Sequence, residues 1–247
     1  MKFALISLLT VLSFSIVAQS VDHSAWTAIL KKNVNTQGMV NYKALAADPT
    51  ALNAYLAVLS QNEPTKKWTT NEKLSFWINA YNAFTIKLIL DYYQGGKLKS
   101  IKDIGTIIPI PRINDGWSKA FIKIGTKTLS LNNIEHDIIR KQFAEPRIHV
   151  ALVCAAKSCP KLRNEAFMPI QLHAQLDDQF YDFVNDPTKN VVRANSATIS
   201  PIFDWYGSDF TKTKPMADWI NKYAKTKMAS ETKINFGEYN WELNEWK

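Results

Sequence analysis

The chain has 247 residues and a formal net charge of +8, and no Gly/Ser/Pro-rich linker interrupts it, which favours one domain over two. Its lysines are scattered in short pairs such as Lys31-Lys32, whereas nucleic-acid binding needs a clustered basic face or a motif. The charge therefore indicates a solvated surface or an anionic envelope component as a partner, and no nucleic acid.

The N-terminus has the pattern of a secretory signal peptide. An apolar stretch runs from Phe3 to Ala18, and Ala18-Gln19-Ser20 places small residues at the −3 and −1 positions of a cleavage site. A stretch of about 16 residues is short for a membrane span. We expect a signal peptide over residues 1–20 and an exported protein, periplasmic or extracellular, with no transmembrane helix after cleavage.

The strongest helical pattern lies between Thr69 and Tyr93. Thr69 and Glu72 form a capping box, and apolar residues then occur on nearly every side, which predicts a buried central helix. Asn79 and Asn82 interrupt that core one turn apart, so their amides need partners, or they line a site. Residues 21–68 before the helix show weaker helical patterns and are expected to pack with residues 69–247 as one unit.

The segment 101–118 looks irregular because of its prolines and is expected to be a long loop. Residues 121–131 predict a β-hairpin that turns at residues 125–127. Asn132 is the expected N-cap of the next helix, which runs to about Gln142 and carries Glu135, His136 and Arg140.

Residues 147–160 concentrate the reactive side chains of the chain. The apolar run from Ile148 to Val153 predicts a buried central strand, and Cys154 and Cys159 lie in the loop that leaves it. A helix starting at Pro169, a hairpin over 191–200, an aromatic and acidic loop over 204–210 and an amphipathic helix around Trp219 follow. Helices with short hairpins and one central strand predict a single α+β domain.

Four blocks of the sequence resemble the bacterial and plant family called domain of unknown function 547. They are Phe76–Ala83, Ser130–Arg140, Arg147–Pro160 and Tyr239–Asn244, and they occur in the family's order. The resemblance implies a secreted or envelope-associated bacterial protein but no reaction. Plant members add a leucine-zipper segment, and no heptad repeat occurs here.

Three interpretations of the Cys/His group remain open. The first is a disulfide between Cys154 and Cys159, since paired cysteines are common in exported proteins. It would close a small ring, contribute about 2 kcal/mol and fix the loop of a non-catalytic envelope binding module. The second is a zinc site made by His136, His149, Cys154 and Cys159, although the spacing matches no established pattern.

The third interpretation is a thiol enzyme, and it is our leading functional hypothesis. Cys154 would be the nucleophile, and His136 with Glu135 would be its partners. His149 is five residues from Cys154, so on a strand it would face the opposite way; it is assigned with Asn79, Asn82 and Cys159 to binding.

The central helix loosely resembles that of papain- and transglutaminase-type folds, which carry their cysteine there, whereas this helix has none. We therefore expect an acyl-transfer or amide-hydrolysing protein of cysteine-peptidase-like or transglutaminase-like type. No cofactor is predicted.

Overall fold

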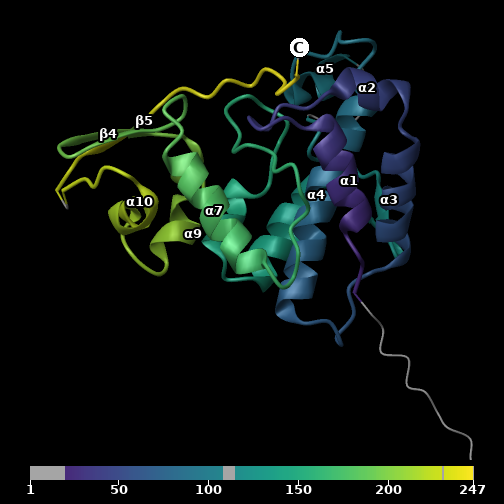
Figure 1. Ribbon diagram of the computed structural model, residues 1–247, viewed down its shortest axis with the longest axis horizontal. Coiled ribbons are helices and arrows are strands. Elements are labelled where there is room, and N and C mark those ends of the chain that lie inside the picture. Colours follow the sequence, from purple (N-terminus) through teal and green to yellow (C-terminus); the bar gives the residue numbers. More distant parts are fainter. Residues whose placement is uncertain (1–19, 108–114, 230, 247) are drawn as a thin grey trace, which may run out of the picture.

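The computed structural model describes residues 20–107, 115–229 and 231–246, so residues 1–19 of the expected signal peptide lie outside it. Three helices, α1 (Ser24–Asn33), α2 (Tyr42–Ala47) and α3 (Thr50–Gln61), lie together beside helix α4 (Thr70–Tyr92), on the right in Figure 1. Helices α2 and α3 contact α4, and α1 contacts α2 and α3. Trp26 of α1 stacks on Tyr55 of α3 with ring centroids 5.4 Å apart. The N-terminal helices thus share one core with α4.

Helix α4 is the buried central helix that the sequence predicts. Its capping box is present, since the Thr69 hydroxyl oxygen accepts from the Glu72 backbone N–H and the Glu72 carboxylate accepts from the Thr69 N–H. The helix then stays buried from Leu74 to Ile86 because apolar residues occupy all of its sides.

The next segment is partly helical. The 3₁₀ helix η1 (Ile101–Asp103) and helix α5 (Ile104–Ile107) occupy the start of the predicted irregular loop, and residues 108–114 lie outside the described residues. Strands β1 (Ile122–Ile124) and β2 (Lys127–Leu129) form the predicted antiparallel hairpin. Gly125 at its turn has φ +58°, a conformation that favours glycine.

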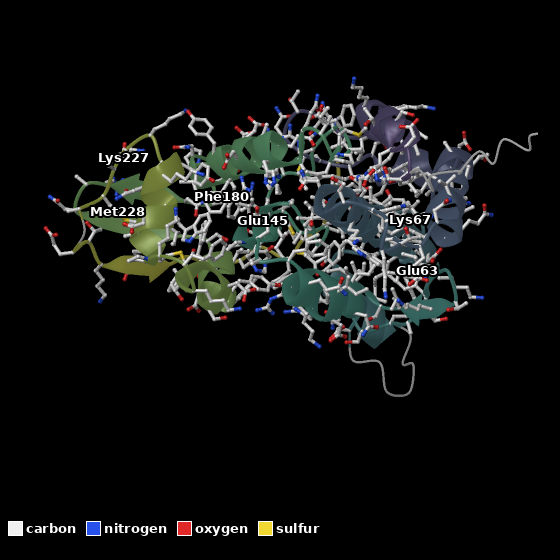
Figure 2. All side chains as sticks on the ribbon, turned by 90° about the horizontal axis from the view of Figure 1, so that it is seen from below. Glu63, Lys67, Glu145, Phe180, Lys227 and Met228 are labelled. Carbon is white, nitrogen blue, oxygen red and sulfur yellow. The ribbon has the colours of Figure 1, made fainter. Side chains whose placement is uncertain are left out.

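A second, smaller cluster lies beside the first. It is built by helices α7 (Leu172–Val184), α8 (Ile202–Trp205), α9 (Gly207–Thr211) and α10 (Met216–Tyr223) and by strands β3 (Val191–Arg193), β4 (Ser196–Ile199) and β5 (Ile234–Phe236). The strand order is β3-β4-β5, with β4 and β5 parallel. Phe180, labelled in Figure 2, packs there against Phe203, Phe210 and Trp219.

The described residues contain no helix long and apolar enough to cross a bilayer. Their mixture of helices and two small sheets confirms the α+β class.

The predicted central strand over Ile148–Val153 is wrong. Pro146–Val150 form a 3₁₀ helix, η3, whose first position suits the fixed φ of Pro146. The apolar run is buried, as expected, but its backbone pairs with a side chain instead of a strand. The Asn82 amide donates to the Ala151 carbonyl oxygen at 2.9 Å and accepts from the Val153 N–H at 2.9 Å.

The helix that carries Glu135 and His136 also differs from expectation. Asn133–Ile139 form a π-helix, η2, followed by helix α6 (Arg140–Gln142). Asn132 makes no cap hydrogen bond; Ser130 and Asn133 cap each other instead, at 3.0 and 3.1 Å. π-Helical turns are rare and frequently lie at functional sites.

Candidate functional site

A cavity of about 180 Å³ lies where the two clusters meet. Fourteen side chains line it: Tyr81, Trp117, Asn132, Glu135, His136, His149, Leu152, Cys154, Cys159, Ile202, Trp205, Tyr206, Tyr239 and Trp241. Five of the seven predicted site residues, Glu135, His136, His149, Cys154 and Cys159, therefore share one cavity, although they come from two separate segments of the chain.

The loop after η3 is folded around the sulfur of Cys159. That sulfur accepts the Cys154 backbone N–H at 3.1 Å and the Tyr239 hydroxyl at 3.2 Å, and the Cys154 thiol and the Ala156 backbone N–H also hydrogen-bond to it. Burial alone would raise the pKa of Cys159, but these donors outweigh burial and lower it. Cys159 is thus the sulfur that ionises first.

Cys154 is the more accessible partner. It is half-buried, whereas Cys159 is only 2% exposed. The hydrogen bond to Cys159, together with burial, raises the pKa of Cys154 well above its usual value. Its sulfur lies 3.4 Å from the Tyr239 hydroxyl oxygen, and both cysteines are free thiols in this structure.

The C-terminal segment holds this loop in place. The Lys157 N–H donates to the Glu242 carbonyl at 2.8 Å, the Ser158 N–H to Asn240 at 3.2 Å, and the Asn244 N–H to Ala155 at 2.9 Å. These bonds also place Tyr239 beside the two sulfurs. Ala155, between the paired segments, has φ +63°, which is unusual for a residue with a Cβ.

His149 forms a pair with Asp209. Its Nε2 lies 2.9 Å from the Asp209 Oδ2, and its ring stacks on Tyr206 with centroids 3.8 Å apart. Burial lowers the pKa of His149 to about 4, although Asp209 acts in the opposite direction. The ring is therefore neutral at pH 7 with its proton on Nε2, and its buried Nδ1 has no partner among the described residues.

Asp209 also connects His149 to the π-helix. Arg140 donates through Nε to the Asp209 Oδ2 at 2.6 Å and through Nη1 to the His136 Nδ1 at 3.2 Å. Burial would raise the pKa of Asp209, but its hydrogen bonds from Arg140, His149 and Lys212 outweigh burial and hold that pKa well below its usual range. Because a guanidinium group can only donate, a neutral His136 carries its proton on Nε2.

Glu135 is buried on the cavity wall and hydrogen-bonds to Tyr206, whose pKa is raised by burial and then by this carboxylate. The Glu135 Oε1 also lies 4.0 Å from the His136 Nδ1. The predicted partners Glu135 and His136 are thus on the same cavity wall, and no direct bond joins either of them to a sulfur among the described contacts.

Asn79 and Asn82 are not lining residues. The Asn79 amide donates to the Phe167 carbonyl at 2.8 Å and accepts from the Phe167 N–H at 3.0 Å, just as Asn82 pairs with the backbone before Cys154. Both asparagines therefore position loops from the central helix.

Sequence reasoning missed Tyr239, Asp209 and Tyr206 as site residues. Tyr239 opens the fourth family block, and the other two lie in residues 204–210, which the sequence predicted as an aromatic and acidic loop and which the structure shows as parts of helices α8 and α9 with Tyr206 between them. Both segments carried a signal that we did not connect to the cysteines.

No group of three or more His, Cys, Asp or Glu side chains in the described ranges could hold a metal ion. The four residues considered for zinc share the cavity wall without forming such a group.

Comparison with known proteins gives one result. Residues 65–184 match the family model described as "Protein of unknown function, DUF547". Neither the curated proteins nor the solved structures contain a match. Three of the four blocks lie within the matched segment and the fourth, with Tyr239, lies beyond it. The match over residues 65–184 confirms that this chain resembles the DUF547 family, whose function is unknown.

Proposed function

We propose that this protein is an exported thiol enzyme that transfers acyl groups or hydrolyses amides, in the manner of cysteine peptidases or transglutaminases. One observation carries the proposal: the Cys159 sulfur is surrounded by hydrogen-bond donors on the wall of a cavity that it shares with two histidines. Nucleophilic acyl transfer by a cysteine requires a stabilised thiolate and a nearby imidazole group that can move a proton.

The lowered pKa favours Cys159 over Cys154 as the attacking sulfur. Cys159 is only 2% exposed, but it lines the cavity, so the proposal requires an acyl group small enough to reach it there. The thiolate adds to a carbonyl carbon, and the carbon–nitrogen bond then breaks as the leaving amine takes a proton from His136, which regains a proton when water or a second amine attacks the thioester. The Cys154 backbone N–H and the Tyr239 hydroxyl now bond to the sulfur, and in the proposed reaction they would donate to the carbonyl oxygen of the attacked group. Water or a second amine then takes the acyl group from the thioester.

The first experiment looks for that thioester. The purified protein is mixed with p-nitrophenyl acetate, the reaction is quenched in acid, and the mass of the intact protein is measured by mass spectrometry. We expect one acetyl group per chain, located on Cys159 by peptide mapping. The Cys159→Ser variant should lose the adduct, whereas Cys154→Ser should keep it. A wild-type protein that stays unmodified while its thiols remain free would overturn the proposal.

Variants of His136 and His149 distinguish an effect on catalysis from an effect on folding stability. The His136 side chain is 40% exposed, so His136→Asn should lower the rate of acyl turnover and leave the free energy of unfolding nearly unchanged. His149 is buried and paired, so His149→Asn should lower stability as well. An unchanged turnover rate in His136→Asn would remove that residue from the mechanism.

Export is supported by the sequence alone, through the apolar stretch and the small residues before Val21. N-terminal sequencing of protein recovered from the periplasm or medium should begin near Val21. Recovery of chains that still begin at Met1 would contradict export by signal cleavage.

The aromatic lining favours a second candidate, a non-catalytic envelope binding module. Trp205 stacks nearly parallel to Trp241 at 5.7 Å, and Tyr239 packs on Trp241 at 4.5 Å, so the cavity offers flat faces to a ligand ring. This candidate predicts that ligand binding survives in a Cys154→Ser/Cys159→Ser double variant, whereas the enzyme predicts no turnover in it.

A further inference from the structure

We propose that Cys154 and Cys159 are a reversible dithiol that exchanges with small disulfides. Oxidation forms a disulfide bond between the two residues, and reduction restores the two thiols. This activity is separate from acyl transfer; only its consequence for turnover rests on the proposed function. The inference starts from the contacts between the two side chains.

The two sulfurs are already neighbours. The Cys154 thiol hydrogen-bonds to the Cys159 sulfur, and one hydroxyl group, that of Tyr239, lies 3.4 Å from the first and 3.2 Å from the second. The loop between them folds back on itself, since the Cys159 N–H donates to the Ala156 carbonyl at 3.1 Å. The fold of this loop thus holds the two side chains at one place, which a disulfide between them requires.

The two thiols differ in solvent exposure, and this difference sets the order in which they react with a disulfide. Cys154 is half-buried and lines the cavity, whereas Cys159 is 2% exposed behind it. An incoming small disulfide reaches Cys154 first. Cys159 is then the resolving thiol, held within reach of the Cys154 sulfur by its hydrogen bonds to backbone N–H groups.

The electron balance is simple. The Cys154 proton moves along the existing hydrogen bond to the Cys159 sulfur, and the Cys154 thiolate attacks the disulfide RSSR, releasing RS⁻. That RS⁻ takes the proton from Cys159, whose thiolate attacks the Cys154 sulfur and expels the second RS⁻. The dithiol loses two electrons, and RSSR gains them as RSH and RS⁻.

The disulfide form would have no nucleophile in the cavity. Under the proposed function, acyl turnover would therefore occur only in the reduced protein. The Tyr239 hydroxyl, which contacts both sulfurs, is the positioning group for the reduced pair.

The test equilibrates the full chain in buffers of reduced and oxidised glutathione at stepped ratios, followed by acid quenching, maleimide labelling and intact mass. We expect two main species, a dithiol with two labels and a disulfide with none, that interconvert with the ratio. Cys159→Ser should instead accumulate one glutathione on Cys154. Cys154→Ser should react with glutathione at least about tenfold more slowly, because its remaining thiol is buried and glutathione is much larger than the acetyl group that reaches Cys159 in the first experiment.

Tyr239→Phe tests the positioning role without removing a sulfur. Losing one donor to the thiolate should slow alkylation of Cys159 at pH 7 by about tenfold and shift its pH profile upward. Tyr223→Phe is the matched control, because its hydroxyl bonds to Asp177 in the second cluster and should leave both thiols unchanged.

Two results would overturn the inference: a wild-type protein that keeps both labels in oxidised glutathione, or one that accumulates the glutathione adduct without closing the ring. Acyl turnover is measured separately in the reduced protein. A reversible disulfide without turnover refutes only the enzyme, and turnover without a disulfide refutes only the exchange.

Discussion

At the scale of single residues, two asparagines show how polar groups inside a core can direct loops. Each amide pairs with a backbone N–H and a carbonyl group of one passing segment, as a neighbouring strand would. The sequence indicated that Asn79 and Asn82 would be buried and need partners, because their helix has no polar face, and the structure confirms it. Their partners could not be predicted, since Phe167 and Ala151 are separated from them by 88 and 69 residues.

Replacing Asn79 by Leu should reveal the cost of unpairing that backbone. The Phe167 N–H and carbonyl would stay buried without partners, so we expect the free energy of unfolding to fall by about 1–3 kcal/mol. Urea denaturation measures the change. Asn53→Leu, at an exposed position of α3, is the control and should change stability by less than about 0.5 kcal/mol. Equal midpoints for Asn79→Leu and the wild type would contradict this account.

Asn82 has a second consequence because its partners immediately precede Cys154. Asn82→Ala should release the backbone of Ala151 and Val153 and loosen the cysteine loop. We expect faster maleimide labelling of Cys159, together with a loss of stability of about 1–3 kcal/mol. Asn79→Ala is the matched control: it should cost similar stability while leaving thiol labelling nearly unchanged. Equal labelling rates in the two variants would show that Asn82 does not position the loop.

At the scale of elements, local patterns predicted most helices and both hairpins. Capping, apolar periodicity and turn residues are local signals, and α4, α10 and the β1–β2 and β3–β4 pairs follow them. The strand prediction for Ile148–Val153 was wrong because we took a buried apolar run to be an extended strand. A short apolar run is buried in either conformation, and here Pro146 and the Asn82 amide favour η3 and a loop.

The wrong strand also led to a wrong prediction about His149 and Cys154. The argument that His149 and Cys154 face opposite ways holds on a strand but not on a 3₁₀ helix followed by a turn, and both residues line the same cavity. The residue types of the site could be predicted from three sequence blocks. Its assembly could not, because Tyr239 and Asp209 reach it through contacts across 60 to 85 residues of chain.

The C-terminal segment should be essential for this element, although the family match ends before it. A chain that ends after Glu238 keeps β5 but loses Tyr239 and the backbone pairing with residues 155–158. We expect both thiols to label rapidly with maleimide and residues 154–159 to exchange amide hydrogens faster. Asn240→Ala, which retains the backbone pairing, should behave like the wild type. Continued protection of Cys159 in the shortened chain would disprove the prediction.

At the scale of the whole molecule, two buried neutral histidines link stability to pH. His23 lies in the first cluster, 2.7 Å from the Tyr55 hydroxyl, and burial lowers its pKa to about 4. His149, between the clusters, also has a pKa of about 4 because of burial. An unfolded chain releases these rings to water, where their pKa returns to about 6.5.

The sign of the effect follows from proton binding. Between pH 6.5 and 4 the unfolded chain binds more protons than the folded one, so the stability present above pH 6.5 is lost as pH falls. The full effect is about 3 kcal/mol for each histidine. Asp209 contributes outside this window, because its lowered pKa removes stability only below the ordinary carboxylate range.

We therefore expect the free energy of unfolding to fall steadily from pH 7 to pH 4.5, measured by urea denaturation at each pH. His23→Gln should flatten that slope by about half, since one of the two rings is removed. His173→Gln, at an exposed position, is the control and should leave the slope unchanged. Because His23→Gln also disturbs the core, NMR titration of the wild-type imidazole protons provides an independent measurement. Resonances assigned to His23 and His149 that titrate near pH 6.5 in the folded protein would refute the link between burial and acid sensitivity.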